Sequence, residues 1–448
     1  MFIWRIIMAY RIPQGKDDFL KMCEESGTHF PYSEDISPLK EKIVVAGKTI
    51  HNRVVYQAME GCDGTFDGSP DELTKRRYLR FARGGAGLIW FEATAVLGEG
   101  RANPRQMYLT DKTKDDFKRI VEDIKEEGIK ANGFEPVVVI QLTHSGRYSK
   151  PQGTPAPLIA YNNPIFEKDN PIDKSRIVTD EYLDTLYEAL VKNALVAKEL
   201  GFDGADIKSC HRYLLSELLS AYNREGRYGG SFENRTRMLT GAVKDAKALT
   251  GKDFIITSRL NVYDGFEYPY GFAVKEGCGI TPDFTESKML VKKLVENGID
   301  MIDMTMGNPY FNPHVNRPYS MGGYEPPEHP LYGVQRMLDG ISLLKQEIKD
   351  TPVISSGISF LGAVSANVCA GYMNNGGFDM AGYGRQTLAY PDVANAITSG
   401  KGLEPSKLCI CCSKCTEIMR KPGGTPGCVI RDNEVYMPLY RKFVLGKE

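Results

Sequence analysis

The chain has 448 residues, of which 42% are hydrophobic and 25% are charged, as in a globular protein with a sizeable core. Its 56 Lys and Arg residues nearly balance its 57 Asp and Glu residues, so the charge indicates neither nucleic acid nor a membrane surface as a partner. The length suggests two or three domains, although one barrel can take up about 250 residues or more.

The chain begins with an apolar run, MFIWRIIMAY, which Arg5 interrupts. A bilayer needs about 20 apolar residues, and no small-residue cleavage site follows the run. We therefore expect no signal peptide, and Met8 is an alternative start. Without export, the scattered cysteines are not expected to form disulfides, and the predicted location is the cytoplasm. These cysteines are Cys23, Cys62, Cys210, Cys278 and Cys369.

Eight short apolar runs rich in β-branched residues predict strands. They lie at 53–59, 87–96, 136–142, 202–208, 254–260, 299–305, 352–357 and 378–384. Amphipathic stretches that begin near Asp or Thr and end at Gly predict helices between them, for example at 71–85, 113–128 and 179–201. This alternation predicts an α/β fold of the (β/α)8 TIM barrel type. An open doubly wound sheet is the alternative, but no Gly-x-Gly-x-x-Gly follows the first strand.

Three long segments rich in Pro, Gly and Asn follow the third, fifth and sixth predicted strands, at 144–178, 261–283 and 305–330. Their aromatic residues argue against disorder, so we expect functional loops on the substrate face of the barrel. The predicted organisation is an N-terminal extension at 1–36, the barrel at 37–402 and a cysteine-rich segment at 403–448.

Side chains at the C-terminal ends of the strands form the active site of such a barrel. Gly357, Gly384 and Arg385 predict a phosphate site, because glycines let backbone N–H groups approach an anion and Arg385 adds charge. Two ordinary turns and a surface arginine are an equally weighted alternative. Gln141 has the donor and acceptor that suit a ring edge, and Arg259 could stabilise an anionic ring.

Lys208, His211 and Tyr213 follow the fourth predicted strand within six residues. Together they could polarise a carbonyl group and donate a proton to the substrate. Taken alone, the stretch favours a structural interpretation, in which His211 caps the next helix and Tyr213 packs beneath it. Further polar residues at the predicted strand ends are Glu60, Glu92, Thr94 and His144.

The stretch CICCSKCTEIMRKPGGTPGC, at 409–428, holds five cysteines. Clustered thiolates bind zinc or an iron–sulfur cluster. Zinc ribbons pair two C-x2-C knuckles, and no second knuckle is present, so the spacing favours an iron–sulfur cluster and leaves Cys411 over. The predicted ligands have the spacing C-x2-C-x2-C-x12-C and are Cys409, Cys412, Cys415 and Cys428.

Several motifs occur in one order between about residues 37 and 435. They are NRVVYQAM, ARGGAGLIWFEATAV, QLTHSGR, GFDGADIKSCHRYLLSELLS, YGGSFENRTR, GYGRQTLAYPD and the cysteine cluster. In this order they resemble the Old Yellow Enzyme family of flavin-dependent oxidoreductases. The nearest subgroup carries an iron–sulfur cluster and includes 2,4-dienoyl-CoA reductase and trimethylamine dehydrogenase.

The resemblance implies FMN at the mouth of the barrel. It also implies that Tyr213 protonates the substrate and that His211 binds the activating carbonyl group. Lys208 stands where the family commonly has His, and Glu60 stands where it often has Thr or Cys. The implied flavin contacts are Ala58, Met59, Ala93, Gln141 and Arg259, and the implied phosphate contacts are Gly357, Gly384 and Arg385.

The cysteine spacing resembles that of trimethylamine dehydrogenase, which makes amine oxidation an alternative. An aromatic cage for a cationic amine favours Trp. The chain has only Trp4 and Trp90, although a cage of Tyr263, Tyr310 and Tyr319 is a further option.

The predicted protein is thus an FMN and 4Fe–4S ene-reductase that reduces the activated C=C bond of an α,β-unsaturated carbonyl compound. Reduced FMN gives the hydride, Lys208 and His211 hold the carbonyl oxygen, and Tyr213 gives the proton. The aromatic loops suggest a bulky apolar enone such as a steroid. An amine dehydrogenase and an electron-transfer subunit are the alternatives. No dinucleotide fingerprint follows the cysteines, so NADH or a separate donor protein is expected to supply electrons; a homo-oligomer is left open.

Overall fold

The computed structural model describes residues 10–447, so Trp4 and the alternative start at Met8 lie outside the described part. Eight parallel strands form a sheet in the order β10-β3-β4-β5-β6-β7-β8-β9. A bridge between Ile354 and Met380 joins the two outer strands and closes the barrel. This confirms the (β/α)8 barrel. The strands are β3 (Val54–Tyr56), β4 (Leu88–Ala95), β5 (Val137–Thr143), β6 (Gly204–Ile207), β7 (Ile255–Asn261), β8 (Met301–Thr305), β9 (Val353–Ile354) and β10 (Ala381–Tyr383).

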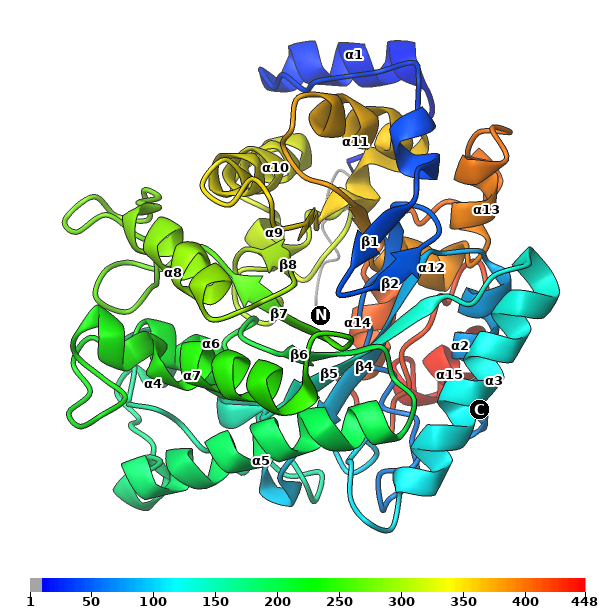
Figure 1. Cartoon of the computed structure of the whole chain (residues 1–448). Helices are drawn as coiled ribbons and strands as arrows, with labels where there is room; N and C mark the ends of the chain where they lie inside the picture. The colour runs from blue at the N-terminus through cyan, green and yellow to red at the C-terminus, as the bar shows by residue number, and fades with distance from the viewer. Residues whose placement is uncertain (1–9, 448) are drawn as a thin grey trace.

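Helices surround the barrel on the outside (Figure 1). The predicted helices at 71–85, 113–128 and 179–201 correspond to the first three of the longer helices around the barrel. The longer helices are α2 (Glu72–Arg83), α3 (Lys114–Asn132), α5 (Asp180–Glu199), α7 (Phe232–Thr250), α8 (Thr285–Glu296), α10 (Pro330–Lys345) and α11 (Ser365–Asn374). Shorter ones are α4 (Pro164–Glu167), α6 (Leu214–Leu219), α9 (Pro313–Asn316), α12 (Arg385–Ala389) and α13 (Val393–Thr398).

Helix α3 continues past Gly128, where the sequence predicted its end. It stops before Gly133, whose φ of 78° is the left-handed conformation that commonly follows a helix. Gly128 has a packing role instead, because a Cβ atom there would lie 2.4 Å from Pro136 Cδ. The predicted stop was therefore wrong by one turn.

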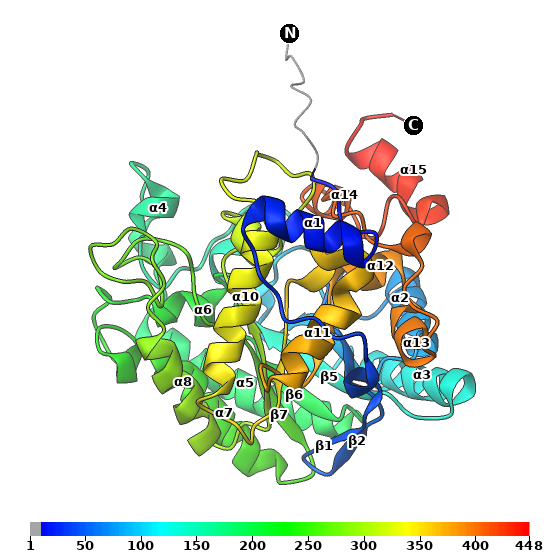
Figure 2. The same cartoon turned by 90° about the horizontal axis from the view of Figure 1, so that it is seen from above.

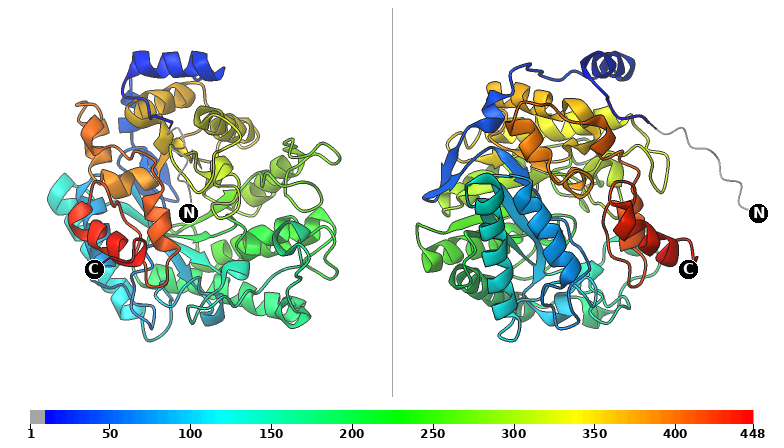
Figure 3. Two further views of the ribbon diagram at one scale, coloured as in Figure 1. Left: turned by 180° about the vertical axis from the view of Figure 1, so that it is seen from behind. Right: turned by 90° about the vertical axis from the view of Figure 1, so that its right-hand side faces the viewer.

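A hairpin that the sequence did not predict closes the N-terminal end of the barrel. It consists of β1 (Ile43–Val45) and β2 (Lys48–Ile50). Its Val45 side chain joins a buried cluster with Leu88 and Trp90, which come from β4. Figures 2 and 3 show the hairpin at the opposite end of the molecule from α14 (Lys414–Met419) and α15 (Asn433–Phe443).

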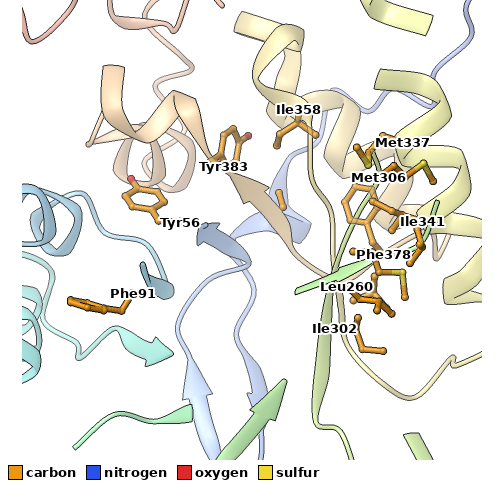
Figure 4. Close-up of a cluster of buried hydrophobic side chains, with 14 of the residues drawn as sticks. Tyr56, Phe91, Leu260, Ile302, Met306, Met337, Ile341, Ile358, Phe378 and Tyr383 are labelled. Atoms are coloured by element: carbon orange, nitrogen blue, oxygen red, sulfur yellow. The ribbon is translucent and has the colours of Figure 1, made fainter. Parts of the chain in front are cut away.

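A larger apolar core lies between the strands and the helices around them. Successive side chains of a strand alternate between the barrel interior and this outer layer. Figure 4 shows Met306, Met337 and Ile341 gathered at one part of the layer, where α10 contacts β8. Full burial of such a side chain contributes about 1.5–3 kcal/mol.

Strand β4 contains an irregularity that changes which of its residues face the pocket. Its pairing with β5 shifts register between Phe91 and Ala93. Such a bulge interrupts the alternation of side chains. Trp90 therefore lies in the interior cluster, Ala93 lines the pocket above it, and Glu92 forms an ion pair with Arg77 of α2.

The cysteine-rich segment is attached to helix α2. Asp432 forms an ion pair with Arg76 at 2.7 Å and a second one with Arg80. Helices α14 and α15 also share a small apolar cluster of their own, made by Ile418, Val429, Tyr436 and Tyr440.

Helix α1 (Lys16–Ser26), in the predicted N-terminal extension, buries Phe19 and Met22 in the main core. The proposed divisions after residues 36 and 402 stay predictions. Among residues 10–447, no helix combines the length and the apolar character needed to span a membrane.

Candidate active site

One pocket, with about 1000 Å³ of empty space, lies at the C-terminal ends of the strands. Every residue that the sequence predicted for cofactor binding or catalysis lines this pocket. The ring-contact candidates are Ala58, Met59, Ala93, Gln141 and Arg259, the phosphate candidates are Gly357, Gly384 and Arg385, and the catalytic candidates are Lys208, His211 and Tyr213. The structure thus brings these residues together, while their roles stay predictions.

Asp206 lies beneath the pocket and orients two of the ring-contact candidates. It accepts hydrogen bonds from Gln141 Nε2 at 2.7 Å, from the backbone N–H of Arg259 at 2.7 Å and from Trp90 Nε1 at 2.9 Å. Burial raises the pKa of Asp206 to about 6, although these donors lower it. The amide of Gln141 is therefore held in one orientation by a buried carboxyl group.

Asp303 has the corresponding role on β8. It accepts hydrogen bonds from Gln57 Nε2 at 2.8 Å and from Ser356 Oγ at 3.0 Å, and its Oδ2 lies 3.4 Å from Arg259 Nε. Burial raises the pKa of Asp303 to about 6, while Arg259 opposes the increase. Arg259 also donates to the carbonyl oxygen of Ala58 at 3.4 Å, so its guanidinium group is fixed at the edge of the pocket.

Arg385 is a buried cation and Arg317 a partly buried one, and neither has an acidic partner among residues 10–447. Arg385 donates to the carbonyl oxygen of Pro318 at 2.8 Å, and its Nη1 atom has no partner within the protein. Arg317 has a hydrogen bond to Ser413 Oγ at 3.3 Å. Burial and the like charge of Arg385 lower the pKa of Arg317 to about 10. Two adjacent cations without acidic partners fit a doubly charged phosphate group.

The turn after β6 directs Lys208 and His211 into the pocket. His211 and Arg212 both have the left-handed conformation, with φ of 64° and 58°. The buried ion pair of Arg212 with Asp264 at 2.9 Å holds this strained turn in place. Burial lowers the pKa of Lys208 and brings the pKa of His211 well below its ordinary value, so His211 is neutral. Its Nε2 atom has no partner within the described residues.

The hydroxyl group of Tyr213 lies at the centre of a hydrogen-bonded group. It is 3.2 Å from Glu60 Oε2 and 3.1 Å from the hydroxyl of Tyr310. The ring of Tyr148 packs on Tyr310, with 4.2 Å between centroids. Burial raises the pKa of Tyr213 well above its ordinary value, and Glu60 adds to the effect. The Tyr213 hydroxyl is therefore protonated at neutral pH.

The structural alternative for this stretch was wrong in one respect. Helix α6 begins after Tyr213, which occupies the N-cap position, and no side chain caps the helix. His211 therefore does not serve as the cap, and both residues line the pocket.

Some strand-end residues point elsewhere. Glu92 accepts a hydrogen bond from the backbone of Gly61 at 2.6 Å, and His144 Nε2 lies 2.8 Å from the Tyr182 hydroxyl. The tyrosine cage that amine binding would use is also not formed as predicted. Tyr310 lines the pocket, whereas the side chains of Tyr263 and Tyr319 are buried elsewhere in the protein.

The five cysteines of the C-terminal segment line a second, smaller cavity of about 380 Å³. Arg385, Leu388 and Cys415 line both cavities, so the cysteines adjoin the main pocket. The backbone N–H of Cys411 donates to Cys409 Sγ at 3.4 Å. Residues 10–447 contain no three His, Cys, Asp or Glu side chains already arranged to hold a metal ion. The donor set is nevertheless made of thiols, the ligands of iron–sulfur clusters.

The sequence did not predict several residues that line the pocket. Gln57 precedes the flavin-contact candidates on the same run, and strict alternation with Met59 could have found it. The others come from loops and from short helices, which are too short to show a period that signals the direction of a side chain. They include Asn316, Arg317 and Ser359, and also Thr416, Met419 and Pro426 from the cysteine segment.

Comparisons with known proteins give both sequence relatives and fold relatives. A family model described as the NADH:flavin oxidoreductase / NADH oxidase family matches residues 38–404. The NADPH dehydrogenase of Geobacillus sp. (strain WCH70) is 33% identical over 270 residues, which cover 59% of this chain and 71% of that protein.

Two solved structures have the same fold at low identity. The 2-naphthoyl-CoA reductase complex with 2-naphthoyl-CoA has a TM-score of 0.68 and 20% identity, covering 86% of this chain and 55% of that one. The 6-hydroxypseudooxynicotine amine oxidase from Pseudomonas geniculata N1 has a TM-score of 0.65 and 21% identity, covering 87% and 54%. This chain thus spans about half the length of each of these two proteins.

Proposed function

Because the chain belongs to the NADH:flavin oxidoreductase / NADH oxidase family and is a flavin-dependent oxidoreductase, we propose that it is an ene-reductase. Its substrate in this proposal is an α,β-unsaturated carbonyl compound, whose C=C bond it reduces. One observation carries the proposal: the candidates for flavin binding, carbonyl binding and proton donation line a single pocket. A structural neighbour is, by its name, a reductase of 2-naphthoyl-CoA.

The hydrogen-bonding groups and the charges of the pocket residues suit FMN. Bound FMN supplies hydride to the substrate. Ala58, Met59 and Ala93 offer a small, apolar surface for its ring. Gln141 and Arg259, already oriented by the buried carboxyl groups beneath them, would hold the polar edge of the ring. In the same proposal the phosphate group binds between Arg317 and Arg385, beside Gly357 and Gly384.

Three side chains of the chain would act on the substrate. Lys208 and the neutral His211 donate hydrogen bonds to the carbonyl oxygen, which gains negative charge as the reaction proceeds. Tyr213, protonated at neutral pH, gives its proton to the α-carbon. Pro309, Met419 and other apolar residues form a wall of the same pocket, which supports a bulky apolar enone such as a steroid as the substrate.

The proposal includes a 4Fe–4S cluster on Cys409, Cys412, Cys415 and Cys428. It is supported by the gathering of these thiols around one cavity that shares Cys415 with the main pocket. A bound cluster exchanges single electrons. Cys412→Ser is expected to remove the iron from protein purified without oxygen, whereas Cys278→Ser, an exposed cysteine outside the segment, is expected to retain it. Equal iron contents in the two variants would count against the cluster.

The reductant in the proposal is NADH or NADPH, because both nucleotides appear in the names of the family and of its member from Geobacillus. A separate electron-donor protein is the other source. Stopped-flow reduction of the oxidised protein by each nucleotide distinguishes the two, because bleaching of the flavin shows direct use.

Amine oxidation is the second candidate. Tyr148, Tyr213 and Tyr310 pack together beside the pocket, with 6.5 Å between the last two ring centroids. Aromatic rings of this kind attract cationic amines. A structural neighbour is, by its name, an amine oxidase.

The two candidates differ in the direction of electron flow. Chemically reduced protein is mixed with a panel of enones, and oxidised protein with a panel of amines, while the flavin absorbance is followed. Rapid reoxidation by an enone is the expected result. Bleaching by an amine without reoxidation by any enone would replace the reductase with a dehydrogenase.

A further inference from the structure

Glu60 lies in the pocket beside the hydroxyl group of Tyr213. It follows β3, and its Oε2 atom is 3.2 Å from the Tyr213 hydroxyl. Its Oε1 atom accepts a hydrogen bond from Asn103 Nδ2 at 2.9 Å, which fixes the carboxyl group in this orientation. Glu60 is partly exposed and lines the pocket, so it has access both to the tyrosine and to the pocket contents.

Titratable groups face Glu60 from several elements. Burial raises the pKa of Glu60, while Lys208 and the hydrogen bond from Tyr213 lower it. The net direction is upward, so Glu60 keeps its proton to higher pH than an exposed glutamate does. The facing groups are Lys208 after β6, Tyr213 before α6, Tyr310 after β8, Glu92 on β4 and Cys62 on the same segment.

The other neighbours of Tyr213 are less suited to supply a proton to its oxygen. Lys208 lies over the face of the ring, with Nζ 3.8 Å from the centroid, so it does not point at the hydroxyl group. The Tyr310 hydroxyl is 3.1 Å away, but burial raises its own pKa, so it holds its proton firmly. Glu60 is thus the neighbour with both the contact and the acidity.

We propose that Glu60 returns a proton to Tyr213 after Tyr213 has given its own proton to the substrate. In the first transfer, the O–H bond of Tyr213 breaks and a C–H bond forms at the α-carbon. In the second, the O–H bond of Glu60 breaks and that of Tyr213 forms again. The carboxylate that remains takes up a proton from the solvent buffer, to which the partly exposed Glu60 has access. The relay needs no oxidant or reductant of its own, and it rests on the proposed function.

The relay acts between turnovers, so its loss has a kinetic signature. Reduced Glu60→Gln holoenzyme is expected to complete a first turnover with an enone at nearly the wild-type rate. Later turnovers are expected to be about 100-fold slower, the lower end of the range for proton-transfer groups. Wild-type turnover should decline as pH rises through the pKa of Glu60, because the proton donor is lost, and Glu60→Gln should lack this decline.

Glu99→Gln is the matched control, because Glu99 accepts a hydrogen bond from the Tyr182 hydroxyl at 3.0 Å but does not line the pocket. It is expected to behave as the wild type. In Glu60→Ala, added formate should restore turnover, whereas chloride at equal ionic strength should not. A first turnover that is slowed as much as the later ones, without rescue by formate, would assign Glu60 a structural role and overturn the relay.

A titration without any enone separates this inference from the proposed function. Ionisation of Tyr213 is followed by ultraviolet absorbance of the holoenzyme, with Tyr213→Phe identifying its signal. The Glu60 carboxylate disfavours the phenolate, so Glu60→Gln is expected to ionise Tyr213 at lower pH. An unchanged titration overturns the relay, whereas a shifted one supports it even if no enone reoxidises the wild type.

Discussion

At the scale of single residues, Arg317 and Arg385 place two like charges side by side in the pocket wall. Arg385 is buried and Arg317 is partly buried, so both guanidinium groups lose hydration, and neither has an acidic partner in the described part of the chain. A bound phosphate group would supply the missing partner through charge-assisted hydrogen bonds. The apoprotein therefore carries a local electrostatic cost that a ligand removes.

We expect Arg385→Met to weaken FMN binding by about 10- to 100-fold, which corresponds to the loss of a hydrogen bond to a charged group. The apoprotein should melt at the same temperature or higher, because one unpaired charge is gone. Fluorescence titration of apoprotein with FMN measures the first effect and thermal denaturation the second. Arg227→Met, on the outer surface, is the control and should bind FMN as the wild type does.

Tyr213→Phe removes a single oxygen atom from a nearly unchanged side chain. We expect reoxidation of the reduced flavin by an enone to slow by about 100-fold or more, while reduction of the flavin stays as in the wild type. Rapid-mixing measurements of the two half-reactions test this. Equal reoxidation rates in the variant and the wild type would remove Tyr213 from the role of proton donor.

The position of Ala93 shows where sequence reasoning at this scale succeeds and fails. The resemblance placed Ala93 at the flavin, and the structure has it in the pocket wall. The alternation of β4 from Trp90 would instead place Glu92 inside. A bulge depends on how a strand pairs with its neighbour, so the residue pattern of a single strand does not reveal it.

At the scale of elements, helix α2 connects the barrel to the cysteine segment. Arg77 pairs with Asp63 and Glu92 on the barrel side, and Arg76 and Arg80 pair with Asp432 on the other. A single helix therefore positions both the loop after β3 and the start of α15.

We expect Asp432→Ala to loosen the cysteine segment, at a cost of about 1–3 kcal/mol for the charged hydrogen bonds that are lost. Hydrogen exchange should rise in α14 and α15 more than in the strands of the barrel. Glu434→Ala, an exposed change in the first turn of the same helix, should leave the exchange pattern unaltered. A uniform rise over the barrel would mean that the segment and the barrel unfold together.

The elements that sequence predicted well are those with long periodic patterns. The eight barrel strands were found as short apolar runs rich in β-branched residues, and the long helices were found from their amphipathic pattern and their terminal residues. The hairpin of β1 and β2 was missed because each of its strands buries only one side chain, Val45 or Ile50, so it has no continuous apolar run like those of the barrel strands. The helix end predicted at Gly128 was wrong because the sequence does not distinguish a glycine needed for close packing from a glycine that ends a helix.

At the scale of the whole molecule, the buried carboxyl groups of the barrel interior make stability depend on pH. Burial raises the folded-state pKa of Asp206 to about 6, whereas an unfolded aspartate has a pKa of about 4. The folded chain therefore binds more protons in this interval, and its stability falls as pH rises through it. Asp303 acts in the same direction.

We expect Asp206→Asn to remove part of this dependence. Other groups titrate too, so the informative quantity is the difference between the unfolding free energies of variant and wild-type apoproteins. That difference should move in favour of the variant as pH rises from about 4 to about 6, and then level off. Urea unfolding at a series of pH values measures it, and a constant difference would contradict the raised pKa.

The assembly of distant segments is the part of the molecule that sequence could not reveal. Thr416, Met419 and Pro426 form part of the pocket wall although their own stretch indicated only a metal site. Arg317 reaches the same wall from a loop without periodicity. Such contacts depend on how separate segments dock, which no local pattern encodes.

The hairpin of β1 and β2 has a consequence for traffic through the enzyme. Together with the apolar layer above it, this hairpin closes the N-terminal end of the barrel, so the pocket does not continue through the barrel. Under the proposed function with NADH or NADPH as the reductant, the nucleotide and the enone use the same pocket. The oxidised nucleotide must leave before the enone can bind, and the protein holds the electrons in the interval between the two binding events.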